Sequence, residues 1–156
     1  MPKVTIQDVT DAGFNAKQFG TPADWSTAGT GYVARLLADA ETYVADRVGS
    51  AAYAAATGAQ ALRLKRAELC YAKAELWRRR AAFLDANAFT AREGNPSAAN
   101  ERKSYLEHAM QAEECLLSNI DLFTSEGDST ALGSGASLGS VETGPFSTAS
   151  LTGLVS

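Results

Sequence analysis

Residues 62–83, LRLKRAELCYAKAELWRRRAAF, carry the strongest structural pattern in this chain. Alanine is abundant and neither glycine nor proline interrupts the segment, which favours a helix. Large side chains recur every seven residues in and beside it: Leu62, Leu69, Leu76 and Phe83, with Cys70, Trp77 and Leu84 alongside. We therefore predict one helix over about 59–89 with a heptad seam for neighbouring helices. At ~1.5 Å per residue this helix spans about 45 Å, which is long for a small domain.

On the N-terminal side, the stretch 32–48 places apolar residues three and four positions apart and ends at Gly49, which predicts a helix. A shorter helix is expected over 3–12, because a threonine and an aspartate stand at capping-box spacing and Gly13 follows. The segment 13–31 between them is rich in glycine and threonine and predicts an irregular connector. Three aromatic residues are expected to anchor this connector onto the helices: Phe14, Phe19 and Trp25.

On the C-terminal side, Gly94 and Asn95 form a turn, and Pro96 suits the first position of a further helix. We expect that helix over about 96–125, ended by Gly127. Together these elements predict an all-α protein, a small helical bundle with one long central helix and an extended C-terminal arm. The helical domain covers residues 1–126 and the arm covers 127–156.

The expected arm is rich in glycine and serine, which makes it flexible, yet apolar residues are spaced along it. These residues are Leu138, Val141, Phe146, Leu151, Leu154 and Val155. A linker that stays disordered needs no such side chains, whereas an extended arm that docks on another chain uses them in pockets. The alternative is a frayed C-terminus.

Charge is divided unevenly along the chain, whose formal net charge is -4. Residues 1–103 hold 14 basic and 11 acidic groups, a balance of +3, and residues 104–156 hold 7 acidic groups and no basic one, a balance of -7. Subunits with this distribution can stack with unlike faces together. The alternative is charge pairing between helices of one subunit.

The two cysteines, Cys70 and Cys115, fall in helical apolar patterns, so buried thiols in a reducing compartment are expected and a disulfide is the alternative. The first residues, MPKVTIQDVTD, lack the apolar core of a signal peptide. No apolar run approaches ~18 residues. We therefore expect no contact with a membrane.

Basic groups crowd the segment 63–80, which holds seven of them and two acids. Arg66, Lys73 and Arg80 repeat every seven residues beside the apolar seam, where a charge must be paired or reach water. Glu113 lies on the apolar face of the last helix, so we predict that it pairs with one of these three, within the subunit or across to a neighbour. A solvated face, a subunit interface and nucleic-acid contact remain the alternatives for the whole run.

Catalysis finds little support in the sequence. His108 is the only histidine, and the residue three positions before it is Tyr105, so the Glu-x-x-His pattern of di-iron bundles is missing. No G-x-S-x-G nucleophile motif occurs either. We expect a non-enzyme that has no catalytic residue, metal ion or cofactor.

Taken together, the pieces GYVARLLADAETYVADRVGSAAY and LRLKRAELCYAKAELWRRRAAF, the last helix and its long extension resemble one family. This family is the head–tail connector, or adaptor, proteins of tailed bacteriophages. The resemblance covers about residues 30–126 and consists of alanine-rich helical spacing without an invariant signature. The connector over 13–31 has no counterpart in the pattern.

The resemblance implies a structural virion protein, assembled in the host cytoplasm, that forms a homo-oligomeric ring in the neck between capsid and tail. Such a ring, usually of twelve copies, lies beneath the capsid portal protein, extends the DNA channel and receives the next neck or tail protein. DNA passes through without sequence-specific binding, so acidic residues suit the channel wall; the candidates are Glu107, Glu114 and Asp121. The arm over 127–156 would dock on the portal or on a neighbouring subunit. The alternative function is a monomeric or dimeric cytoplasmic helical chaperone or regulatory binding module.

Overall fold

The computed structural model of the chain describes residues 1–19, 24–27, 30–88 and 96–133. Within these ranges the chain is helical and contains no strand, so the predicted all-α class is confirmed. The elements in order are α1 (Ile6–Asp11), the 3-10 helix η1 (Ala16–Phe19), α2 (Tyr32–Val48), α3 (Ser50–Ala55), α4 (Gly58–Ala88) and α5 (Pro96–Gly133).

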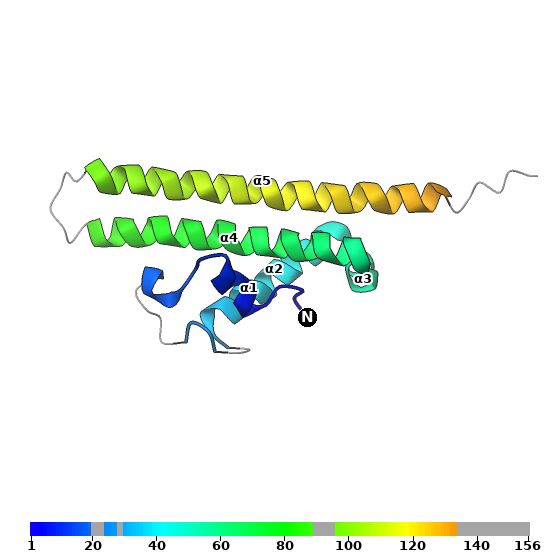
Figure 1. Ribbon diagram of the computed structural model, residues 1–156, viewed down its shortest axis with the longest axis horizontal. Coiled ribbons are helices and arrows are strands. Elements are labelled where there is room, and N and C mark those ends of the chain that lie inside the picture. The colour runs from blue at the N-terminus through cyan, green and yellow to red at the C-terminus, as the bar shows by residue number, and fades with distance from the viewer. Residues whose placement is uncertain (20–23, 28–29, 89–95, 134–156) are drawn as a thin grey trace, which may run out of the picture.

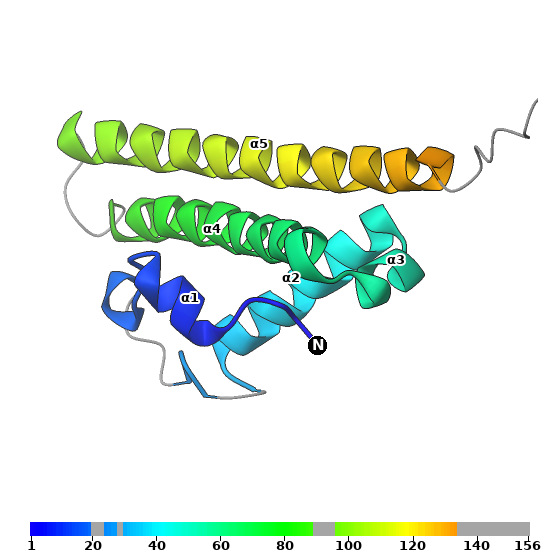
Figure 2. The same ribbon diagram turned by 45° about the vertical axis from the view of Figure 1, so that its right-hand side comes forward.

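The long helix α4 forms the middle of the molecule, with α5 on one side and α1 and α2 on the other (Figure 1). Helices α4 and α5 run antiparallel as a hairpin, and α3 lies near the N-terminal end of α4 (Figure 2). At ~1.5 Å per residue the 38 residues of α5 span about 57 Å. Helices α4 and α5 are therefore the two longest elements among the described residues.

Local sequence explains where the first two helices begin. Thr5 accepts a hydrogen bond from the Asp8 amide at 3.2 Å, while the Asp8 carboxylate accepts one from the Thr5 amide at 2.8 Å, so the expected capping box is confirmed. At the start of α2, the amides of Tyr32 and Val33 donate to the carbonyl oxygens of Asp24 and Trp25 at 3.0 and 3.2 Å. These bonds satisfy amides that the helix itself leaves without partners.

The connector between α1 and α2 is anchored by its aromatic side chains, as predicted. Phe14, Phe19 and Trp25 are all buried in one cluster with residues of α2 and α4. The ring centroids of Phe19 and Trp25 lie 5.1 Å apart, and those of Phe14 and Trp77 lie 5.0 Å apart with their edges toward faces. Aromatic packing of this kind, together with η1, holds the described residues of the segment against the helices.

The heptad seam predicted for α4 is only partly buried. Leu76 has no exposed surface, but Leu62 is 58% exposed and Phe83 is 38% exposed. The physical reason is that α4 meets α5 through smaller residues, among them Ala67 and Cys70, which pack in one cluster with residues of α5. Part of the large-residue seam is consequently left on the surface.

The last helix is longer than predicted, because α5 continues through Gly127 and ends at Gly133. A glycine inside a helix costs only about 1 kcal/mol relative to alanine, and Ala131 and Leu132 favour continuation. The predicted end of this helix near residue 125 is therefore wrong. The apolar residues of the predicted arm all lie outside the described residues: Leu138, Val141, Phe146, Leu151, Leu154 and Val155.

A disulfide bond joins α4 to α5. Cys70 and Cys115 face each other across the hairpin with their Cα atoms 6.0 Å apart, a normal separation for this bond. The expectation of free thiols was therefore wrong, and the alternative of a disulfide holds. The hairpin alignment that brings the two cysteines opposite each other is a tertiary feature that their spacing alone does not reveal.

Candidate interaction surfaces

The outer face of α5, directed away from α4, carries both acidic and large apolar side chains. The residues that α5 buries recur at helical spacing: Ala109, Ala112, Leu116, Ile120 and Phe123. Residues on the opposite side of the helix project into solvent. We call this side the α5 stripe and define it as Leu106, Glu107, Met110, Glu114, Leu117 and Asp121.

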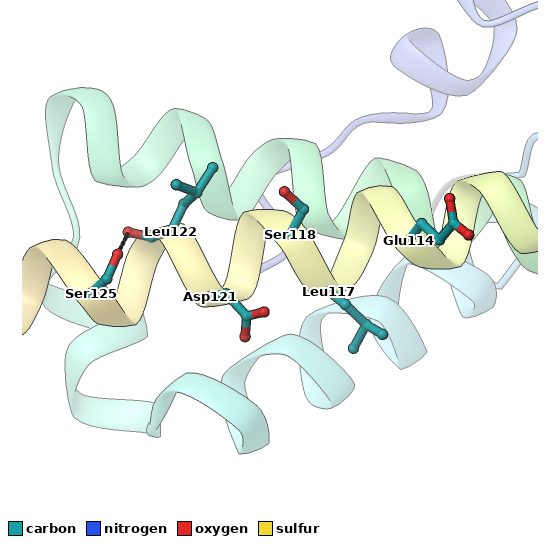
Figure 3. A pocket seen from close by; sticks show the side chains of 6 residues that line it. All are labelled: Glu114, Leu117, Ser118, Asp121, Leu122 and Ser125. Atoms are coloured by element: carbon teal, nitrogen blue, oxygen red, sulfur yellow. Dashed lines mark hydrogen bonds between the residues drawn. The ribbon is translucent and has the colours of Figure 1, made fainter.

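The three predicted channel-lining acids all belong to the α5 stripe and are exposed. Glu107 lies 3.9 Å from Lys103, one turn earlier, which is a weak surface pair. Glu114 and Asp121 border an open depression that also includes Leu117 (Figure 3). Leu117 and Asp121 project from one edge of α5 in that view. A single chain has no lumen, so their role as a channel lining remains a prediction.

Large apolar residues are unusually exposed on the α5 stripe. Met110 is 61% exposed and Leu117 is 46% exposed. Exposed apolar side chains that cluster along one helix face, rather than scattering singly, indicate a surface that contacts another molecule.

A second face, which is only partly exposed, lies on α4 and is basic instead of acidic. We call it the α4 stripe and define it as Leu62, Arg66, Leu69, Lys73, Arg80 and Phe83. Arg66 is exposed, and Lys73 and Arg80 are half-buried. Part of the apolar seam beside them also faces solvent, because Leu62 and Phe83 are exposed.

Glu113 does pair with the basic run of α4, although with a different partner from those predicted. Its carboxylate binds the Arg78 guanidinium, which also contacts Glu75 at 2.6 Å. In the structure Glu113 faces the opposite flank of α4 from Arg66 and Lys73, which explains the error. This pair bridges α4 and α5 within one subunit.

Arg80 is engaged by aromatic rings instead of by Glu113. Its guanidinium lies 4.5 Å from the centre of the Tyr105 ring and 5.6 Å from that of Trp77. Trp77 in turn stacks on Tyr105 at 5.4 Å and contacts the ring of His108 at 4.9 Å. These rings hold the Arg80 guanidinium through cation–π contacts.

Sequence reasoning missed Glu68, which has no exposed surface. Its carboxylate accepts hydrogen bonds from the amides of Lys3 and Val4, at 2.7 and 3.0 Å, and from the Tyr53 hydroxyl. Burial raises the pKa of Glu68 and also raises the pKa of Tyr53. The available signal was its position four residues after Leu64, on the buried side of α4.

Three further observations bear on function. The described residues contain no group of three metal-binding side chains, and none of the described helices is long and apolar enough to cross a membrane. No protein-family model, curated protein or solved structure matches this chain. Function must therefore be argued from the surfaces themselves.

Proposed function

We propose that this chain is a structural virion protein, a head–tail connector of a tailed bacteriophage. Many copies, twelve by the resemblance, form a ring that joins the capsid portal to the neck or tail and continues the DNA channel. The arm docks on the portal or on a neighbouring subunit. The protein assembles in the host cytoplasm and acts in the virion without catalysis.

The observation that carries the proposal is the long α4–α5 hairpin with unlike faces. One subunit cannot cover such a hairpin, because α1 and α2 reach only one side of α4 (Figure 1). Exposed Met110 and Leu117 on α5, and Leu62 on α4, are left for other molecules. Two different faces on one subunit suit a head-to-tail contact, which closes into a ring when the rotation between subunits allows it.

The direct test is co-sedimentation with the portal protein encoded in the same genome. Two chains are compared: the full-length protein and a chain ended at Gly133, where α5 ends. A cut at 126 would remove helix as well as arm and would confuse the result. We expect the full-length protein to bind as many copies and the shortened chain to lose most of its binding, because repetition around a ring multiplies a weak contact of each arm.

The outcomes separate the competing functions. Equal binding by both chains would place the portal contact in the helical body and refute the docking arm. Failure of both chains to bind an intact portal would refute the connector. A monomer or dimer that binds no portal would favour the cytoplasmic helical binding module.

A further inference from the structure

We propose that the partner of the α5 stripe is the α4 stripe of a second copy of this chain, with the two helices antiparallel. The inference rests on the proposed assembly function and names the surface through which neighbouring copies meet. It concerns contacts between copies alone and requires no portal.

Charge and spacing match between the two stripes. The basic residues Arg66, Lys73 and Arg80 follow one another at intervals of seven, and so do the acidic residues Glu107, Glu114 and Asp121. Each set spans about 21 Å at ~1.5 Å per residue. In an antiparallel arrangement Arg66 meets Asp121, Lys73 meets Glu114, and Arg80 meets Glu107.

The same alignment brings apolar side chains together. It places Leu69 beside Leu117 and Phe83 beside Leu106, within three residues of a charge pair along each helix. Leu69 is half-buried in the single chain and Leu117 is largely exposed. Burial of these side chains supplies affinity, while the charge pairs set register and exclude the parallel orientation.

The contacts already present within one subunit leave these charges available. Among the described residues Glu107 pairs with Lys103 on its own helix, at the limit of an ion pair. Arg80 is held over Tyr105 and Trp77 without an acidic partner among the described residues. A second copy would bring each of them an opposite charge.

The placement of the stripes makes the contact head-to-tail. The α5 stripe points away from α4, whereas the α4 stripe lies on a different side of the hairpin, so one bound copy cannot cover both. Each copy therefore keeps one stripe available for the next copy. Because α4 and α5 are antiparallel within a subunit, copies related by a small rotation about a ring axis keep α4 of one near-antiparallel to α5 of the next.

Charge reversal at the middle pair of the alignment, Lys73 with Glu114, tests the inference. We would measure association of the full-length chain by sedimentation velocity up to about 1 mM. The variants are Lys73→Glu, Glu114→Lys and the double variant that carries both. Lys17→Glu, on the exposed surface of η1, is the control with the same change of charge.

We expect the wild type to associate, each single variant to associate about tenfold more weakly or worse, and the double variant and the control to associate like the wild type. The inference is overturned if the wild type stays monomeric throughout, if the double variant is as weak as the single ones, or if the control weakens equally. Association through the stripes without portal binding would refute the connector function alone. Portal binding by a chain whose copies never associate would refute this inference alone.

Discussion

At the scale of single residues, Glu68 ties the N-terminal segment to the centre of the molecule. The buried carboxylate joins the amides of Lys3 and Val4 to the hydroxyl of Tyr53 on α3. Three parts of the chain that are distant in sequence thus meet at one side chain. Such a group is costly to bury as an ion, and its hydrogen bonds are costly to leave unmade.

Stability should depend on pH through this residue. Because burial raises the pKa of Glu68 in the folded protein, the folded state binds a proton more tightly than the unfolded chain. The contribution of Glu68 to the free energy of unfolding is largest at pH values below the pKa that its side chain has in the unfolded chain. It is lost as the pH rises through the higher pKa that the side chain has in the folded protein. Urea unfolding of Glu68→Gln at several pH values should show a flatter pH dependence than the wild type, because glutamine does not titrate.

The control for this measurement is Asp46→Asn, an exposed acid on α2 whose loss should leave the pH dependence in place. Glu68→Ala, which removes the acceptors altogether, should lower the free energy of unfolding by about 3 kcal/mol or more. Identical pH dependence for the wild type and Glu68→Gln would show that Glu68 does not titrate differently in the folded state.

At the scale of elements, the residues at which helices begin and end were easier to predict than the sides of the helices that are buried. Gly49 ends α2 where it was expected to, with a φ of 88° that favours glycine. The buried side of α4 was misjudged because large residues were assumed to face inward, whereas alanines such as Ala67 and Ala74 let neighbouring helices approach closely. Glycine is also a weak stop inside a strong helix, which is why α5 passes Gly127.

The candidate surfaces were likewise predictable in their residues but not in how the helices pack against each other. The basic residues of the α4 stripe could be named from their seven-residue spacing, and the acidic residues of the α5 stripe from the acidic character of the last helix. The choice of Arg78 as the partner of Glu113 could not, because it depends on how α4 and α5 are rotated against each other. Glu68 was missed for a similar reason, since its partners come from the N-terminal segment and α3.

The disulfide should stabilise the hairpin substantially. Cys70 and Cys115 are 45 residues apart, so the bond restricts the unfolded chain over a long loop. Reduction, or the paired change Cys70→Ala with Cys115→Ala, should lower the free energy of unfolding by about 2–4 kcal/mol. Denaturant unfolding with and without reductant measures this directly.

The single variant Cys115→Ala supplies the control, because it cannot form the bond and should not respond to reductant. A wild-type protein with the same unfolding midpoint in both conditions would contradict a stabilising role for the disulfide.

At the scale of the whole molecule, the two stripes of the hairpin are the basis of the proposed contact with other chains. Its two stripes differ in charge and lie on different sides, so copies can follow one another in one direction. The small layer of α1, α2 and the connector stabilises α4 from the remaining side (Figure 2). We interpret this arrangement, a hairpin with two stripes and a stabilising layer on its remaining side, as that of a ring subunit rather than of a self-contained enzyme or carrier.

The central claim is that many copies assemble in a closed ring on a portal. The measurement that tests it most directly is the native mass of the complex formed by the full-length chain and the portal protein. We predict a single species in which a fixed, large number of copies joins each portal, because a closed ring fixes the copy number; the resemblance implies twelve. A complex that holds one or two copies, or a continuous range of copy numbers, would contradict the claim.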